Sequence, residues 1–330
     1  MHLSCVISFG IFVRRMTIEA ITATLLLSVG LDVHATCALS TEPHPRGEVG
    51  LQLLYPDRQD GWQDASELGA SWIRVEVRWD WIQVGPTSGF DERYADRVFA
   101  QVAAHPSISV LLLLNHVPTW AARDHDLLPG RAAAAAAWLI RRYGQYVRAL
   151  EVLNEPNLPG YGWPDTWATP KESAITYGKT LTAVSGAIRE IDRKVFVVSA
   201  GLSPQGDPES FARWMVRTTP SQCLDAFGLH PYSQSGKFAS VQRNATMLLQ
   251  QEIGHTKPIW FTEFGTASNA ERGALLDTLA IESTLVPMTI FFNDIDIGWI
   301  SDTYGLRTKN GRPKPDYAQF KRLFSGRIRE

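Results

Sequence analysis

The chain has 330 residues, of which 45% are hydrophobic, and a formal net charge of −2 at pH 7. This length allows one large domain or two small ones, and the composition is ordinary for a globular protein with a sizeable core. A nearly neutral chain without a lysine-rich or arginine-rich run lacks the electrostatic footprint of a nucleic-acid-binding protein, so we expect no nucleic-acid partner.

The first 38 residues have the layout of a signal peptide. Two arginines precede an apolar stretch at residues 21–31 and small residues follow it, so the pattern fits cleavage after Ala35 or after Ala38. A membrane anchor is the alternative, but the apolar stretch is shorter than the ~20 residues that a spanning helix needs. We therefore predict that residues 1–38 direct export to the periplasm or the cell exterior, with no stable membrane insertion after cleavage.

The three cysteines, Cys5, Cys37 and Cys223, have the spacing of neither a zinc site nor a disulfide framework. If the first segment is removed, at most two of them remain. We therefore do not expect disulfide bonds to hold this fold together.

From residue 46 to residue 326, apolar runs rich in β-forming residues alternate with amphipathic stretches. Eight strands are predicted, at residues 50–55, 72–77, 108–114, 149–153, 195–200, 226–229, 259–262 and 288–292. Helices are predicted at residues 91–104, 131–146, 172–191, 241–253, 271–285 and 316–324. Strands that alternate with helices indicate parallel βαβ units, and near-continuous apolar strands indicate a sheet that is covered on both faces.

Eight such units in about 280 residues match the size of a single α/β domain of the (β/α)8 TIM barrel type. The alternative is an open doubly wound sheet, which usually carries a glycine-rich phosphate-binding turn after its first strand. Residues 56–60 follow the first predicted strand and contain no glycine. We therefore predict that residues 46–326 form one barrel domain.

Two glutamates stand at the ends of predicted strands. Glu155 lies in the string Leu-Asn-Glu-Pro-Asn at 153–157, and Glu263 lies in Trp-Phe-Thr-Glu-Phe-Gly at 260–265. Catalytic residues of barrel enzymes come from the C-terminal ends of several strands. A retaining glycosidase needs two carboxyl groups that face each other across the glycosidic bond. The pair therefore predicts an enzyme that cleaves sugars.

Each glutamate also has a simpler interpretation. Pro156 should hold Glu155 in extended backbone at the barrel rim, and the alternative for Glu155 is an exposed glutamate in a turn. Glu263 is flanked by aromatic residues, among which an unpaired carboxylate is costly to bury. The alternative for Glu263 is a core carboxylate held in a salt bridge.

These two motifs, together with the apolar strand around Arg74, resemble the retaining glycoside hydrolases of clan A, closest to the enzymes of families 39 and 5. The resemblance covers nearly the whole chain after residue 46. It implies that Glu155 is the general acid/base and Glu263 the nucleophile of a double displacement. The expected substrate is an oligo- or polysaccharide cleaved at O-glycosidic bonds of β configuration, with no metal and no organic cofactor.

The resemblance also implies contacts to the substrate. Asn154 matches an asparagine that binds the 2-hydroxyl of the sugar, and Arg74 resembles an arginine that supports the nucleophile. His230 and Tyr232 resemble a pair at the end of strand six near the nucleophile. Trp299 resembles the tryptophan that floors the sugar site after strand eight, so we expect a cis peptide bond after it.

Other candidates follow from their positions at strand ends. Either Asn115 or His116 is expected to face the sugar at the end of strand three, and the pattern does not separate them. Arg78 is an alternative to Arg74 because alternate residues of a strand share a face. Trp120 and Trp163 follow strand ends, and flat aromatic rings suit the apolar faces of sugars, so both are expected to line subsites.

Two other functions share many of these residues. A non-catalytic carbohydrate-binding barrel, such as one used in exopolysaccharide assembly, would not need both glutamates. A transglycosidase would use every residue named above and would differ only in how well it excludes water from the covalent intermediate.

Overall fold

The computed structural model describes residues 37–324, except residues 168, 233–237, 255, 269–270, 274, 276–285 and 298–302. Its centre is a sheet of eight parallel strands in the order β5-β4-β3-β2-β1-β8-β7-β6. The strands are β1 (Glu48–Gln52), β2 (Trp72–Arg78), β3 (Ser109–Asn115), β4 (Ala149–Val152), β5 (Phe196–Ser199), β6 (Phe227–Leu229), β7 (Ile259–Phe264) and β8 (Met288–Phe291). Parallel bridges from Val198 to Ala226 and from Leu202 to Leu229 join β5 to β6 and close the sheet into a barrel. The predicted TIM barrel is confirmed.

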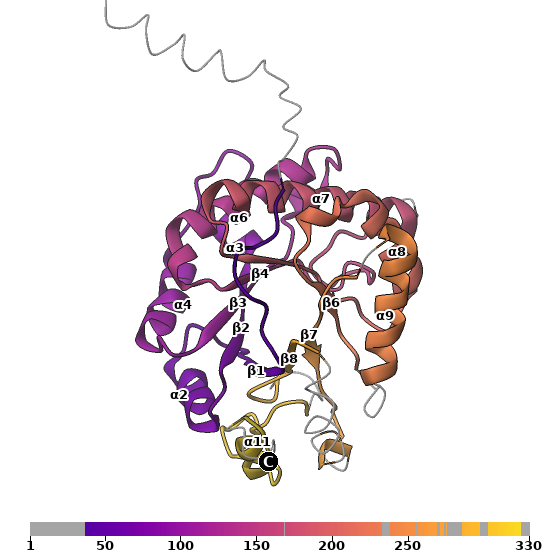
Figure 1. The fold of residues 1–330 in the computed structure, drawn as a ribbon. Helices are drawn as coiled ribbons and strands as arrows, with labels where there is room; N and C mark the ends of the chain where they lie inside the picture. The colour runs from indigo at the N-terminus through magenta and orange to yellow at the C-terminus, as the bar shows by residue number, and fades with distance from the viewer. Residues whose placement is uncertain are drawn as a thin grey trace, which may run out of the picture. The chain divides into compact units, whose positions relative to one another are not determined.

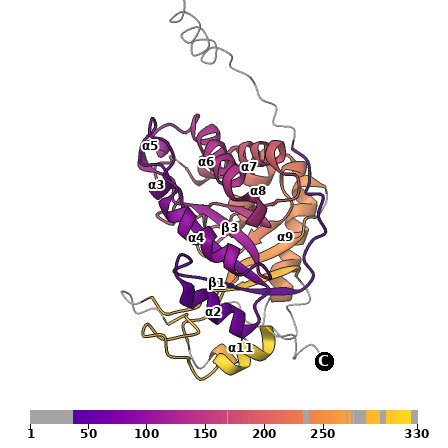
Figure 2. The ribbon, with the colours of Figure 1, turned by 90° about the vertical axis from the view of Figure 1, so that its left-hand side faces the viewer.

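Helices surround the strands in Figures 1 and 2. They are α2 (Gln59–Leu68), α3 (Trp79–Ile82), α4 (Arg93–Ala104), α5 (Thr119–Ala122), α6 (Leu128–Tyr143), α7 (Pro170–Ile191), α8 (Pro208–Thr218), α9 (Phe238–Ile253) and α11 (Tyr317–Phe324). The predicted helix at 271–285 lies mostly outside the described residues. Among the helices that are described, none has the length and apolar character to cross a membrane.

Helices α2 and α8 were not expected from the sequence. The start of α8 does carry a signal, because the Asp207 side chain accepts a hydrogen bond from Ser210 N and Pro208 occupies the first turn. Helix α2 has no side-chain cap at its start and ends at Gly69 in left-handed backbone. Helix α11 packs beside α2 and brings the C-terminal part of the chain against the first βα unit (Figure 2).

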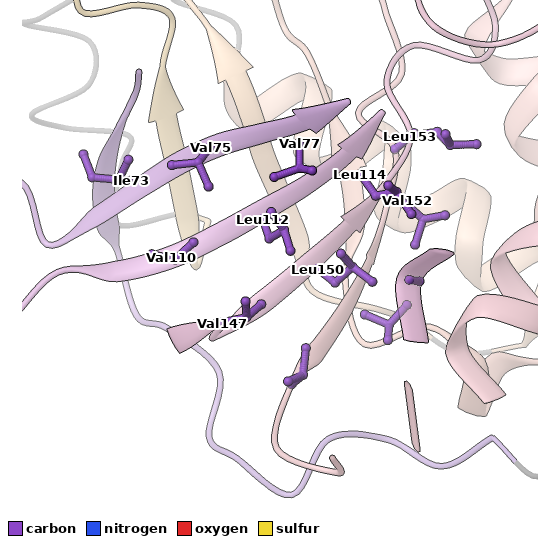
Figure 3. Packing of buried hydrophobic residues seen from close by; sticks show 14 of the residues in the cluster. Ile73, Val75, Val77, Val110, Leu112, Leu114, Val147, Leu150, Val152 and Leu153 are labelled. Atoms are coloured by element: carbon purple, nitrogen blue, oxygen red, sulfur yellow. The ribbon is translucent and has the colours of Figure 1, made fainter. Parts of the chain in front are cut away.

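The alternation of side chains along the strands divides the core in two. Outward residues of β2, β3 and β4 pack beneath the helices; they are Ile73, Val75, Val77, Val110, Leu112, Leu114, Leu150 and Val152 (Figure 3). Inward residues form a second cluster inside the barrel, with Trp72, Leu111, Ala149, Phe196, Trp260 and Met288 among its members. Further along β2 the inward positions are polar, beginning with Arg74, so the interior changes from apolar to charged toward the C-terminal ends of the strands.

A disulfide bond joins Cys37 to Cys223 and corrects the expectation that disulfides play no part in this fold. Spacing did not predict it, because the two cysteines are 186 residues apart in the chain and meet only through the tertiary fold. The segment after Cys37 stays on the barrel: Ser40 N donates to Asp225 Oδ1 at 2.6 Å, and the His44 ring packs on Phe196 at 4.8 Å.

Candidate active site

Arg74 lies at the centre of the polar groups at the C-terminal end of the barrel, and it is completely buried. Its Nε donates to Glu151 Oε2 at 2.6 Å, and its Nη2 donates to Asn154 Oδ1 at 2.8 Å. Its Nη1 is hydrogen-bonded to both Gln52 and Glu263. Burial lowers the pKa of Arg74, but the carboxylates of Glu151 and Glu263 raise it by more, so the net pKa is raised and the guanidinium remains charged.

Arg78 shares the parity of Arg74 on β2 but does not reach this cluster. Its Nη2 donates to Asp80 Oδ2 at 2.7 Å, and its guanidinium lies over the ring of Trp81. Of the two arginines left open by the alternation of the strand, Arg74 is therefore the one that contacts Glu263.

Glu263 is buried near the end of β7, where the pairing with β8 shifts register between Phe261 and Phe264. Strict alternation would place Glu263 on the outward face with Phe261. The irregularity instead turns both Thr262 and Glu263 into the barrel, as a β-bulge does. Tyr232 OH donates to Glu263 Oε2 at 2.7 Å. The Glu263 carboxylate thus has hydrogen-bond donors on both of its oxygens.

The surroundings of Glu263 hold it in the ionised form. Burial alone would raise the pKa of Glu263, but the charges of His230 and Arg74 and the hydrogen bonds from Tyr232 and Arg74 outweigh it, and the pKa is lowered. The same carboxylate and burial raise the pKa of Tyr232 well above its usual value, so the phenol stays a donor. An ionised, buried carboxylate is what a carboxylate nucleophile requires.

Glu155 lies just beyond β4 and is also buried. The expectation that Pro156 keeps it in extended backbone is wrong: its φ is +41°, and that of Leu153 is +66°. Positive φ is uncommon outside glycine and costs on the order of 1–3 kcal/mol. Glu155 N donates to Gly201 O at 3.2 Å, which helps to hold this bend. The bend turns the Glu155 carboxylate toward His230.

His230 brings the two glutamates together. Its Nδ1 lies 2.9 Å from Glu155 Oε1 and 3.7 Å from Glu263 Oε2, and its ring is fully buried. Burial lowers the pKa of His230, but Glu263 and the hydrogen bond with Glu155 raise it, and the net pKa is raised. A Cβ on Gly201 would lie 2.0 Å from His230 Nε2, so only glycine leaves room for the ring at this point.

Glu151 and Gln52 are members of the cluster that the sequence analysis did not single out, and Glu151 is the charged one of the two. It is completely buried, four residues before Glu155, and accepts hydrogen bonds from Thr262 Oγ1 at 2.8 Å and Gly201 N at 3.0 Å besides that from Arg74. A charged residue inside an otherwise apolar predicted strand is the signal that could have found it, since unpaired charges are almost never buried.

At the end of β3 the structure separates the two candidates. Asn115 is buried, and a Cβ on Gly162 would lie 2.3 Å from its side-chain oxygen. His116 is about a third exposed, has a φ of +58°, and places Nε2 3.0 Å from Glu76 Oε1. Asn115 Nδ2 donates to the same Glu76 oxygen at 3.1 Å. His116 is therefore the partly exposed residue of the two, and Asn115 is a buried hydrogen-bond donor to Glu76.

His116 lines a cavity of about 650 Å³, and neither Glu155 nor Glu263 is among its lining residues. Its other lining residues include Asp80, Arg123, His125, Trp163 and Asp165, which come from the loops after β2, β3 and β4. Trp163 is nearly buried and donates from Nε1 to Ser173 Oγ at 2.8 Å, so only part of its ring faces the cavity. Trp120 packs instead against Trp79 and donates to Gln83 O, outside this cavity.

The aromatic residue directly after β8 is Phe292. Trp299, which we expected there, lies outside the described residues, as does the peptide bond after it; the bond between Phe292 and Asn293 is cis. The Phe292, Tyr232 and Tyr304 rings stand edge to face, with centroids 5.6 to 6.1 Å apart. These three rings form an aromatic wall next to Glu263, since Tyr232 is hydrogen-bonded to it.

In the described part of the chain, no three side chains of His, Cys, Asp or Glu are grouped so that they could hold a metal ion. The groups that do converge are three glutamates, an arginine, a histidine, a tyrosine and an asparagine. They can bind hydroxyl groups, hold one carboxylate ionised and place a proton on a second.

No protein-family model and no curated protein matches the chain. A family 39 glycoside hydrolase from the gut symbiont Bacteroides cellulosilyticus WH2 superposes with a TM-score of 0.68 at 16% identity; the match covers 85% of this chain and 64% of that one. The GH39 enzyme from Xanthomonas axonopodis pv. citri gives 0.64 at 18% identity, over 88% and 68%. A GH5_18 protein from Bifidobacterium longum subsp. longum gives 0.60 at 13% identity, over 84% and 78%. At these identities the likeness establishes the barrel fold that this chain shares with them.

Proposed function

We propose that the protein is a retaining glycoside hydrolase in which Glu263 is the nucleophile and Glu155 the general acid/base. The observation that carries this proposal is the position of both carboxylates within 4 Å of one atom, His230 Nδ1. Close carboxylate pairs, about 5–5.5 Å apart, form a covalent glycosyl-enzyme, whereas inverting enzymes need room for a water between them. The two surroundings also differ, which is typical of an acid and a nucleophile that work as a pair.

In the first step, a carboxylate oxygen of Glu263 bonds to the anomeric carbon while the bond from that carbon to the leaving oxygen breaks. Glu155 gives its proton to the leaving oxygen. Arg74 and Tyr232 keep Glu263 anionic until that moment, since both donate hydrogen bonds to it. The anion is therefore ready without a separate proton transfer.

In the second step, a water molecule gives a proton to Glu155 as its oxygen bonds to the anomeric carbon and the bond to Glu263 breaks. The configuration is then retained and both glutamates return to their first state. Asn154 supports both steps: Arg74 holds its Oδ1 at 2.8 Å, which leaves its amide N–H groups to bind a hydroxyl of the sugar next to the broken bond.

The substrate class follows from the shape and lining of the site. The cavity of about 650 Å³ that is lined by His116 and Trp163, from the segments that follow β3 and β4, offers polar groups and a ring edge to further sugar units. We therefore propose an oligo- or polysaccharide substrate with β-linked units. The printed names of the structural neighbours, which include an exo-β-1,4-mannosidase and β-glucosidases, support the β configuration.

We also propose that the protein is exported and cleaved after Ala35 rather than after Ala38. Cleavage after Ala35 retains Cys37 and its disulfide to Cys223, whereas cleavage after Ala38 removes one partner. Disulfides persist in oxidising compartments such as the periplasm and the cell exterior, which supports the same location. Mass spectrometry of the mature N-terminus tests this point directly.

The experiment that tests the activity is trapping with a panel of 2-fluoro glycosides that carry a good leaving group. Peptide mass spectrometry should find one sugar bound to Glu263 in the wild type and none in Glu263→Gln. Glu155→Gln is the second control, because an activated leaving group needs no proton and the adduct should still form. An adduct on another residue, or none from folded protein with any glycoside or oligosaccharide, would contradict the proposal and favour a carbohydrate-binding barrel.

A further inference from the structure

The carboxylate of Glu151 has no role in the two chemical steps, yet it is buried in contact with the groups that perform them. It receives hydrogen bonds from Arg74 Nε at 2.6 Å, Thr262 Oγ1 at 2.8 Å and Gly201 N at 3.0 Å. These three donors satisfy most of the roughly four acceptor sites of the buried carboxylate. The hydroxyl of Thr262 is the link to the catalytic residues.

Glu151, Thr262 and His230 form a series of hydrogen bonds, and the chemistry of each group determines which atom donates. An ionised carboxylate only accepts, so the Thr262 hydroxyl must give its single proton to Glu151. Its oxygen lone pairs then face His230 Nε2, 3.1 Å away. Two acceptors cannot form a hydrogen bond with each other, so Nε2 must carry a proton.

This settles which nitrogen of His230 exchanges its proton. With Nε2 protonated in every state, the second proton of the ring comes and goes at Nδ1, which lies 2.9 Å from Glu155 Oε1. We propose that Glu151, acting through Thr262, is a positioning residue that fixes the Nε2–H tautomer of His230 and so directs the exchangeable proton to Glu155. This rests on the proposed function in that Glu155 is taken as the general acid/base.

The charged groups around His230 determine how readily its ring takes up the second proton. The ionisable groups that face the ring are Arg74 from β2, Glu151 and Glu155 from β4 and the residues after it, Tyr232 from the loop after β6, and Glu263 from β7. Three carboxylates stand against one arginine, and those of Glu263 and Glu155 raise the pKa of His230 against the effect of burial, which favours a further proton on Nδ1 facing Glu155. That proton is the one that the leaving oxygen receives.

Thr262 can be changed with little loss of shape. Thr262→Val removes the hydroxyl and keeps the branched side chain, and Thr262→Ser keeps the hydroxyl. Thr289→Val is the control, because Thr289 is equally buried, lies on the outward face of β8 away from His230, and its hydroxyl has no hydrogen-bond partner among the described residues. All three variants leave the glutamates, Arg74 and His230 in place.

The first measurement is nitrogen-15 NMR of histidine-labelled protein, with the His230 signals assigned by their loss in His230→Gln. The neutral ring should show the Nε2–H tautomer, and Thr262→Val should convert it to a tautomer mixture that Thr262→Ser restores. A neutral His230 with its proton on Nδ1 in the wild type, or an unchanged tautomer in folded Thr262→Val, overturns the proposal. This readout does not depend on activity, so it stands even if no glycoside is turned over.

The second measurement is the pH dependence of kcat/KM on a glycoside that the wild type cleaves. Thr262→Val should lose roughly 10²-fold in kcat/KM, less than the ~10⁴-fold loss of an enzyme locked in a wrong tautomer, and should shift the basic limb of the profile. Thr262→Ser and Thr289→Val should stay within about threefold with unshifted limbs, because neither breaks the chain of hydrogen bonds. Equal losses in Thr262→Val and Thr289→Val, without a shift in the profile, would indicate a packing effect only and overturn the proposal.

Discussion

Two buried arginines stand at opposite ends of this barrel, and their partners differ in number. Arg189, on α7 at the N-terminal end, is bonded to the Asp225 carboxylate and to the backbone carbonyls of Ala38 and Val195. Asp225 also accepts from Ser40 N and Val197 N, both at 2.6 Å. Arg189 has a single carboxylate partner there, and each of its three side-chain nitrogens donates a hydrogen bond. That balance holds the chain in place.

Arg74 at the C-terminal end meets an unbalanced set. It contacts Glu151 and Glu263 directly, and Glu155 lies beyond His230 in the same buried space. With more carboxylates than arginines in this space, the pKa of His230 is raised despite burial, which favours a proton on the ring nitrogen that faces Glu155. The comparison suggests that a balanced buried pair stabilises the fold, whereas an unbalanced cluster supplies a mobile proton for chemistry.

The largest effect should follow from breaking the unbalanced cluster at its nucleophile. Glu263→Gln should lower kcat/KM by about 10⁴-fold or more, as loss of a catalytic nucleophile does. The fold should survive, because the amide oxygen can still accept from Arg74 while the amide NH2 group donates to the Tyr232 hydroxyl, which can also accept. Steady-state kinetics and circular dichroism measure the two quantities. Residual activity within tenfold of the wild type in pure protein would exclude Glu263 as the nucleophile.

The balanced pair should respond in the opposite manner. Asp225→Asn leaves the buried Arg189 without a counter-charge, and breaking a buried pair costs roughly 3–5 kcal/mol of unfolding free energy. Denaturant unfolding should show this loss while kcat/KM of the remaining folded protein stays within about twofold. A stable Asp225→Asn protein with impaired kinetics would mean that the two ends of the barrel are not separable in this way.

Reduction of the disulfide tests the same end of the barrel. Cys223→Ser frees the segment that begins at Cys37 and should lower the unfolding free energy by about 2–4 kcal/mol. Dithiothreitol should reproduce the loss in the wild type and have no further effect on the variant. The kinetic constants should not change, because the disulfide lies away from Arg74 and the glutamates.

The sequence predicted the site at the C-terminal end of the barrel better than the contacts at its N-terminal end. Glu155 and Glu263 could be predicted because a polar residue at the end of an apolar run is apparent from the sequence itself. The same local pattern of apolar runs predicted all eight strands. The pairing of Arg189 with Asp225 and of Cys37 with Cys223 was not predicted, because those partners meet only after the barrel closes. Local periodicity carries no information about such long-range contacts.

Within the site, the backbone departs from regular geometry where the sequence could not show it. Alternation would have put Glu263 on the outer face, and only the irregular pairing of β7 with β8 brings it inward beside Thr262. Pro156 indicated extended backbone at Glu155, whereas tertiary contacts with Gly201 and His230 hold it at positive φ. Functional residues sit at these local exceptions, where neighbouring contacts override intrinsic preference.

The pH dependence should separate the two members of the catalytic pair. Because the pKa of Glu263 is lowered, the acid limb of the activity profile should appear below the usual titration range of glutamate. Any stability that the ionised Glu263 contributes to the fold is present above its unfolded pKa and is lost as the pH falls through its folded pKa. The pKa of His230 is raised, so the proton shared with Glu155 should be lost only above the usual 6.5. A bell-shaped profile of kcat/KM checks both limbs. A basic limb below 6.5 would contradict the assignment of His230.

A third kind of buried carboxylate, which has no ion-pair partner in the part of the chain that the structure describes, should give the smallest effect. Asp294 follows β8 and accepts from Leu54 N at 2.9 Å, and burial raises its pKa to about 7. A carboxyl whose folded pKa exceeds its unfolded value stabilises the fold at low pH and loses that contribution as the pH rises toward 7. Asp294→Asn removes the ionisable group, so its melting temperature should gain roughly 2–4 °C over the wild type at pH 8 and less at pH 5. Asp126→Asn, at an exposed position, should gain nothing at either pH. An equal gain for Asp294→Asn at both values would show that the carboxyl is already ionised at pH 5, and that a buried carboxylate here needs no arginine to hold its charge.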